Sequence, residues 1–245
     1  MGMLHVRCGD DILGTLEAAG VPGERVKWID GSWLGRDFIG DDAALDGPAA
    51  ADEIVLWFEH DLFDQAILCA LLSRFADRPP RGELTMVDVA PLLASRPGFR
   101  GLGELEAPDL APLFDARRPV AEDQLALGRR AWAAISDPDP DALEDVLATD
   151  TEALPYLRDA LIRLCMERHP ASDGLVLSER LALQCVDAGA RTPVAAFLAV
   201  QEREAAPWMG DTMFFDVLDG LEAKGLVARG DAGLLAVTDE GAARL

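Results

Sequence analysis

The chain has 245 residues, of which 50% are hydrophobic, and its 44 acidic and 22 basic side chains give a formal net charge of −22. This length and apolar content are sufficient for one large domain or two modest ones with hydrophobic cores. The apolar runs are far shorter than the roughly 20 residues that span a bilayer, and no basic start precedes an apolar leader, so we expect a cytoplasmic protein with no membrane partner.

The acidic excess extends along the whole chain. Residues 1–100 carry 9 basic and 17 acidic side chains, residues 101–173 carry 7 and 16, and residues 174–245 carry 6 and 11. Because Lys and Arg provide most of the affinity of proteins for phosphate backbones, this distribution argues against a nucleic-acid partner. The four cysteines are widely separated and form no metal-type or redox-type pair, so we expect reduced and mostly buried thiols.

The first 100 residues predict an α/β domain with a mostly parallel, Rossmann-like sheet, because short apolar strands alternate with helical patterns. We expect strands at Met3–Cys8 and Arg25–Ile29, a third that starts at Glu53, and a fourth at Leu84–Val87, with helices at Ile12–Ala19 and after Asp61. The stretch 31–51 is expected to be a long loop, which is either a functional lid or a disordered insertion.

Residues 101–173 predict a helical connecting region, and no further sheet is evident between Pro91 and the last part of the chain. Residues 174–245 predict a winged-helix module, with helices at Ser178–Ala188, Pro193–Gln201 and Thr212–Lys224 followed by a hairpin of Leu226–Ala228 with Leu234–Thr238. Acidic residues on the outward face of the third helix would repel DNA. Contact with the first domain or with a protein partner therefore fits this module better.

Polar residues follow every predicted strand of the first domain, in the segments Gly9-Asp10-Asp11, Asp30, Glu59-His60-Asp61 and Asp88. The carboxyl ends of parallel strands meet at one edge of a sheet, where ligands bind in open α/β folds. Asp11, Asp61 and Asp64 have the alternative role of capping a helix. Capping does not explain Glu59 and His60, which makes this edge a candidate site.

The edge lacks glycine-rich phosphate-binding motifs, so a bound anion would need a cation as a bridge. One possibility is Mg²⁺ or Mn²⁺ held by Asp10, Glu59 and Asp61, with His60 as general base or acid, which would give a metal-assisted hydrolase of a small phosphorylated or nucleotide-like substrate. The other is an arginine from Arg117-Arg118 or Arg129-Arg130, although these arginines could simply pair with the many acids.

Several segments together resemble a bacterial family known only as a domain of unknown function. They are LHVRCGDD, VLWFEHDLFDQ, FRGLGEL, RRPVAEDQLALGRRAWAAI, GARTPVAAFLAVQ, APWMGDTMFF and VTDEG, and they extend over almost the whole chain. The resemblance implies no established activity, but it directs attention to a ligand-binding set of Asp10, Asp64, Gln65 and Arg118 beside the catalytic candidates Glu59, His60 and Asp61. Asp11 replaces a serine that is frequent in that family, and Gly31-Ser32-Trp33-Leu34-Gly35 stands where the family has an acid-Gly-Pro sequence.

The sequence is therefore consistent with two main functions. The first is the metal-assisted hydrolase. The second is a non-enzymatic regulatory or adaptor protein that binds a small-molecule ligand at the sheet edge and a protein through the winged helix. Regulation of transcription is a third possibility, which the charge distribution disfavours.

Overall fold

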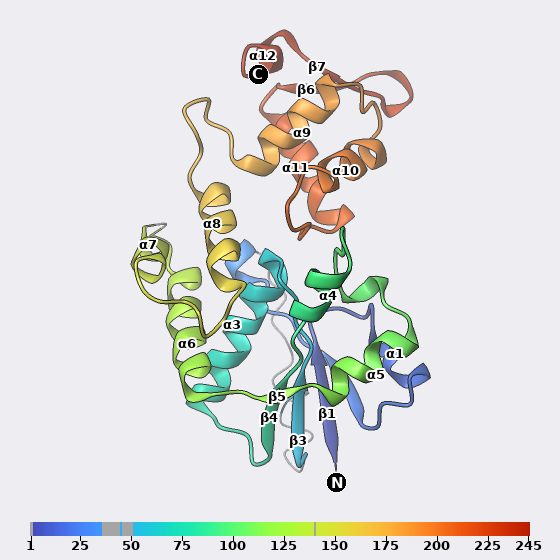
Figure 1. Cartoon of the computed structure of the whole chain (residues 1–245). Helices are drawn as coiled ribbons and strands as arrows, with labels where there is room; N and C mark the ends of the chain where they lie inside the picture. The colour runs from blue at the N-terminus through green and yellow to red at the C-terminus, as the bar shows by residue number, and fades with distance from the viewer. Residues whose placement is uncertain (1, 36–44, 46–50, 140) are drawn as a thin grey trace. The chain divides into compact units, whose positions relative to one another are not determined.

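The computed structural model describes residues 2–35, 45, 51–139 and 141–245 (Figure 1). The chain divides into two compact units, Met1–Leu161 and Ile162–Leu245. The finer division at residues 100 and 173 stays a prediction. Among the described residues, none of the helices has the length and apolar character needed to cross a membrane.

The first unit contains a five-stranded sheet in the order β2-β1-β3-β4-β5. Its strands are β1 (Met3–Arg7), β2 (Glu24–Lys27), β3 (Glu53–Leu56), β4 (Glu83–Met86) and β5 (Arg118–Pro119). The first four pair in parallel, which confirms the predicted mostly parallel α/β sheet, whereas β5 pairs antiparallel with β4.

Strand β5 corrects the prediction that no sheet follows Pro91 until the last part of the chain. It has only two residues and includes a proline, so its sequence carries no alternating pattern. Proline is tolerated there because β5 lies at an edge of the sheet. Its strand character comes from pairing with β4, in which Met86 lies opposite Arg118.

The register of the parallel strands brings their carboxyl ends to one edge. Val6 pairs with Leu56, and Leu56 pairs with Met86, so β1, β3 and β4 end almost level. The residues that follow these three strands therefore emerge together, as the sequence predicted.

Helices cover both faces of the sheet, as Figure 1 shows. Helices α1 (Leu13–Ala18), α4 (Ala90–Ser95) and α5 (Ala107–Asp115) contribute to a core that includes Val55 and Trp57 of the β3 region. Helices α3 (Leu62–Asp77) and α6 (Glu122–Ser136) pack together on the other face, and a Cβ atom at Gly128 would lie 2.5 Å from Leu72 Cβ. Since α3 lies between the sheet and α6, it is buried on most sides and lacks a clear amphipathic pattern.

Short elements complete the first unit: η1 (Ser32–Leu34), η2 (Leu102–Glu104) and α7 (Ala142–Leu147). Helix α8 (Leu157–Arg168) runs across the boundary between the two units. Most of the predicted loop 31–51, and with it the choice between a lid and an insertion, lies outside the described residues.

The second unit contains α9 (Leu177–Asp187), α10 (Pro193–Gln201), α11 (Asp211–Ala223) and the short α12 (Asp239–Ala242). Strands β6 (Val227–Arg229) and β7 (Leu235–Val237) form an antiparallel pair connected through η3 (Asp231–Gly233). Phe214, Leu218 and Leu221 of α11 form the centre of a core with residues of α9 and α10. These three side chains therefore form the buried face of α11.

Candidate functional site

A buried arginine organises the polar residues at the carboxyl ends of β1 and β3. Arg7, the last residue of β1, is 3% exposed. Its Nη2 donates to Glu59 Oε1 at 2.6 Å and to Asp11 Oδ2 at 2.9 Å, and its Nε donates to Asp11 Oδ1 at 3.1 Å. Its Nη1 donates to Asp64 and to the Trp57 carbonyl. Each of the five N–H groups of the guanidinium therefore has an acceptor.

The carboxylates of this cluster are also held by other groups. Asp61 accepts the Asp64 amide at 3.0 Å, which is the capping role that the sequence offered for it. Asp64 accepts the Glu59 amide at 2.9 Å and the Cys8 thiol at 3.0 Å. The Leu102 amide donates to Glu59 Oε2, and a Cβ atom at Gly101 would lie 2.6 Å from the same oxygen. The segment around Gly101 therefore covers the cluster.

The acids of this cluster are buried and outnumber its bases, and both conditions raise the pKa values of Glu59 and Asp61. Burial, reinforced by Asp64, raises the pKa of Glu59 to about 7 although Arg7 opposes the shift. Burial and Asp64 also raise the pKa of Asp61 well above its usual range. Burial disfavours the charged guanidinium, yet Asp64 and Glu59 keep the pKa of Arg7 well above its ordinary value. The guanidinium is thus always charged, and protons neutralise part of the surplus of carboxylates.

The predicted metal ligands are only partly brought together. Glu59, Asp61 and Asp64 each offer an oxygen within 4.8 Å of the others, and all three are buried. Asp10 is not part of this group. Its side chain is 71% exposed and lies 2.6 Å from Lys27 Nζ, because the turn after β1 brings it beside the end of β2. The acid set fits a hard cation incompletely, since Glu59 and Asp64 already contact the Arg7 guanidinium.

His60 lies apart from the hydrogen bonds of this cluster. Its ring stacks on Phe99 with centroids 6.3 Å apart and meets Tyr156 edge-on at 6.2 Å. Its Nδ1 is buried without a hydrogen-bond partner among the described residues. Burial lowers the pKa of His60, which leaves a neutral imidazole at pH 7.

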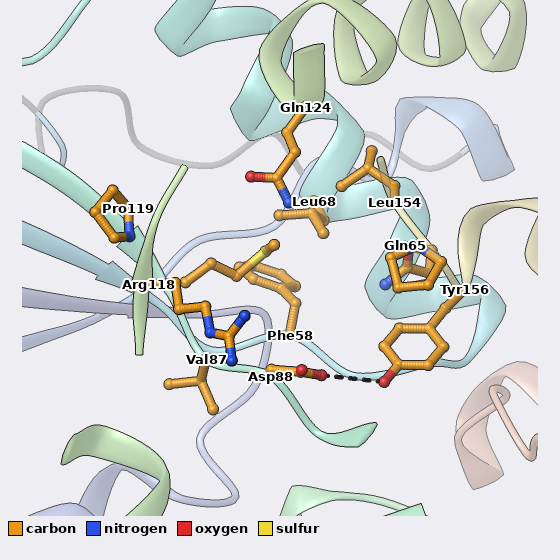
Figure 2. A pocket seen from close by; sticks show the side chains of 12 residues that line it. Phe58, Gln65, Leu68, Val87, Asp88, Arg118, Pro119, Gln124, Leu154 and Tyr156 are labelled. Atoms are coloured by element: carbon orange, nitrogen blue, oxygen red, sulfur yellow. Dashed lines mark hydrogen bonds between the residues drawn. The ribbon is translucent and has the colours of Figure 1, made fainter. Parts of the chain in front are cut away.

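A cavity of about 180 Å³ opens beside this region, at the carboxyl ends of β3 and β4 (Figure 2). Its polar lining comes from Gln65, Asp88, Arg118, Gln124 and Tyr156. Its apolar lining comes mainly from Phe58, Leu68, Met86, Val87, Pro119, Leu154 and Pro155. A largely apolar cavity with a few convergent polar groups is the usual form of a small-ligand site.

Arg118 is the basic residue on the wall of the cavity. It forms no ion pair with any residue that the structure describes, whereas its neighbour Arg117 pairs with Glu53 at 2.6 Å. The other two candidate arginines are also engaged: Arg129 contacts Asp77 at 3.0 Å, and Arg130 contacts Thr149 Oγ1 at 3.5 Å. Pairing with the abundant acids thus accounts for Arg117 and Arg129 but not for Arg118.

Gln65 connects the cavity to the acid cluster. Its Nε2 donates to the Glu59 carbonyl at 2.6 Å, and its side chain also lines the cavity. The residue is 2% exposed, and its Oε1 has no hydrogen-bond partner among the described residues. A buried acceptor without a donor is uncommon in folded proteins, and an unseen ligand or water is a frequent reason for one.

Asp88 and Tyr156 complete the polar wall. The Tyr156 hydroxyl donates to Asp88 Oδ1 at 3.3 Å, and the Ala90 amide donates to the same oxygen at 2.8 Å. Burial, followed by the nearby Asp88 carboxylate, raises the pKa of Tyr156, so its hydroxyl remains a donor. Figure 2 shows the Asp88 carboxylate turned toward Tyr156 rather than toward Arg118.

Arg7 and Tyr156 belong to the site although the sequence did not predict them there. A signal existed for Arg7, because a charged residue that ends an apolar strand in a sheet covered on both faces has to be paired. The signal for Tyr156 is weaker: it is the only tyrosine of the chain. His5, predicted to be a packed histidine, is fully buried and accepts the Trp57 indole N–H at 3.0 Å.

No protein-family model matches the chain, and a search of curated proteins finds no match either. The resemblance to a bacterial family of unknown function therefore stays a prediction.

Proposed function

We propose that the first unit binds a small organic anion in the cavity at the carboxyl ends of β3 and β4. The observation that carries this proposal is Arg118, which lies on the cavity wall and forms no ion pair with any described residue. What distinguishes Arg118 from the other arginines without a printed acidic partner is its position on the wall of this cavity, beside buried apolar side chains. A guanidinium presents a planar fork of N–H donors that matches a carboxylate or a phosphate.

The surroundings of Arg118 favour a small and partly apolar molecule. Phe58, Leu68 and Leu154 are each at most 3% exposed and contribute to the lining. The volume of about 180 Å³ is below that of a typical cavity for a drug-sized ligand, so a metabolite of few atoms fits best. The anionic group would lie at Arg118, and an apolar body would lie against these three side chains.

Binding measurements with one altered arginine test this proposal. Isothermal titration calorimetry would be run with carboxylates, amino-carboxylates and phosphate monoesters on the wild type and on Arg118→Gln. Loss of a charge-assisted hydrogen bond predicts at least about 10-fold weaker binding in the variant. The matched control is Arg81→Gln, because Arg81 is an exposed arginine that precedes β4 at its amino end, away from the cavity. Anion binding that is equal in Arg118→Gln, or absent from the whole panel, would reject the proposal.

A metal-assisted hydrolase is the second candidate, and the observation that favours it is the group of Glu59, Asp61 and Asp64. In that scheme the three carboxylates hold Mg²⁺ or Mn²⁺, and the neutral His60 imidazole acts as the base. It ranks second because Arg7 already neutralises part of the group and would face the ion. Mn²⁺ titration of the wild type and of Asp61→Asn, with phosphoester turnover as a second readout, tests it. Metal binding that survives in Asp61→Asn would remove this candidate.

For the second unit we infer a winged-helix module that contacts protein rather than nucleic acid. Three helices followed by a two-stranded pair support the assignment. Asp219 and Glu222, exposed on α11, already pair with Arg229, and Lys224 pairs with Glu179. Few cations thus remain for phosphates. Fluorescence anisotropy with duplex DNA at physiological salt should show no tight binding, and a sequence-specific complex would overturn this inference.

A cytoplasmic location completes the proposal. Cys8, Cys69 and Cys185 are buried and Cys165 is half-buried, and none of the four belongs to a disulfide. Free thiols are typical of a reducing compartment.

A further inference from the structure

We propose that the ligand of the cavity is a zwitterion, an aliphatic α-amino acid or a close analogue, whose carboxylate contacts Arg118 and whose ammonium group contacts Asp88 and Gln65. This inference rests on the proposed anion site and adds the chemical class of its ligand. Three observations support it: the opposite charges of Arg118 and Asp88 on the cavity wall, the Gln65 Oε1 acceptor without a donor among the described residues, and the apolar lining of the cavity.

The first observation is that the cavity presents two opposite charges that do not pair with each other. Asp88 and Arg118 both line it, yet no ion pair joins them. The Tyr156 hydroxyl and the Ala90 amide both donate to Asp88 Oδ1, which holds the carboxylate on the Tyr156 side (Figure 2). A simple anion or a phosphate dianion at Arg118 would meet the like charge of Asp88. A ligand that carries both charges would satisfy Arg118 and Asp88 together.

The second observation is the acceptor of Gln65. Its Nε2 is engaged by the Glu59 carbonyl at 2.6 Å, so the orientation of the amide is fixed and Oε1 is the free atom. The Gln65 side chain is 2% exposed and lines the cavity, so a donor group of the ligand would satisfy this acceptor, which a carboxylate cannot do. An ammonium group carries three N–H donors, which is enough for both Gln65 and the open oxygen of Asp88.

The third observation is the hydrophobic lining beside these polar groups. Phe58, Leu68, Met86 and Leu154 provide contacts for an aliphatic side chain but no hydrogen-bonding side-chain groups. Because the cavity is about 180 Å³, a side chain about the size of that of leucine or valine is the expected upper range.

The experiment compares three molecules that differ by one charged group. Calorimetry of the full chain would use L-leucine, isocaproate, which lacks the amino group, and isoamylamine, which lacks the carboxylate. We expect leucine to bind about 10- to 100-fold tighter than either single-charge analogue, since each analogue leaves one charged group of the wall without its partner. Asp88→Asn should remove the preference for leucine over isocaproate but leave isocaproate binding in place. The asparagine retains the oxygen that accepts the Ala90 amide, so the fold should persist, which circular dichroism checks.

The outcomes separate the zwitterion from the anion site itself. If isocaproate binds as tightly as leucine and both depend on Arg118, the zwitterion is rejected and the anion site stands. If leucine binds equally well to Arg118→Gln, the anion site is rejected together with the zwitterion. If leucine does not bind at millimolar concentration while a phosphate monoester binds through Arg118, the amino-acid class is rejected and the anion site remains.

Discussion

Arg7 and Glu59 are 52 residues apart in the sequence, yet their side chains meet at 2.6 Å and are only 4% and 7% exposed. This ion pair connects the end of β1 to the residue that follows the β3 region. The amide of Leu102 donates to the second oxygen of Glu59, so a third segment is attached to the same pair. The pair therefore holds together the edge of the sheet beside which the cavity lies.

Replacement of Arg7 by methionine should destabilise the protein strongly. The variant leaves Glu59 and Asp64 buried without their cation, and removal of one partner of a buried ion pair typically costs about 3–5 kcal/mol. Urea denaturation followed by circular dichroism measures the free energy of unfolding. Arg129→Gln is the control, because its pair with Asp77 is exposed and should contribute less than about 1 kcal/mol. Equal losses in the two variants would contradict a structural role for Arg7.

Glu59 should make stability depend on pH between its ordinary pKa and its folded-state pKa. Burial raises that pKa from 4.5 to about 7, so the folded protein holds a proton that the unfolded chain releases. Its stabilising contribution is complete below pH 4.5 and is lost as the pH rises through 7, a change on the order of 1–3 kcal/mol. Glu59→Gln, which does not titrate, should show a flatter profile in urea melts from pH 4.5 to pH 8. Parallel profiles for the two proteins would show that Glu59 titrates normally.

A methyl group at Gly101 should disturb the cover of the acid cluster. The Cβ atom of Gly101→Ala would lie 2.6 Å from Glu59 Oε2, and a close contact of this kind typically costs about 1–3 kcal/mol. The control is Gly14→Ala in α1, where a Cβ atom meets nothing within 4 Å and where alanine favours the helix by about 0.5–1 kcal/mol. Thermal melts should therefore shift in opposite directions. A neutral Gly101→Ala would mean that the segment yields and that Glu59 is not tightly covered.

Local sequence patterns were sufficient to predict the four parallel strands of the sheet and the helices α1 and α3 that alternate with them. The strands β1, β3 and β4 are short apolar runs, and Gly20 and Pro22 mark the end of the first helix. Each of these elements can therefore be recognised from a few neighbouring residues. Their parallel pairing then follows from the alternation of strand and helix, and with it the common edge at which Glu59, Asp61 and Asp88 emerge.

The arrangement of the site could not be predicted in this way, because it depends on contacts between distant segments. Asp10 and Glu59 both follow strands. Asp10, however, pairs with Lys27 at the surface, whereas Glu59 pairs with the buried Arg7. The cavity likewise combines Gln65 of α3 with Tyr156, which is 91 residues later in the chain (156 − 65). Packing, rather than position in the sequence, therefore decides whether a residue at the end of a strand is buried or exposed.

The cysteines should differ in reactivity according to burial. Burial raises the pKa of Cys8 well above its usual range, with Asp64 adding to the shift, and it raises the pKa of Cys69 to about 12. Because the thiolate is the reactive form, these two should label slowly with iodoacetamide in the native protein, and the half-buried Cys165 should label first. Mass spectrometry of tryptic peptides over a time course measures the order, and labelling in urea gives the rate for the unfolded chain. Early modification of Cys8 would show that the edge of the sheet opens and that the Arg7–Asp64 cluster is exposed in solution.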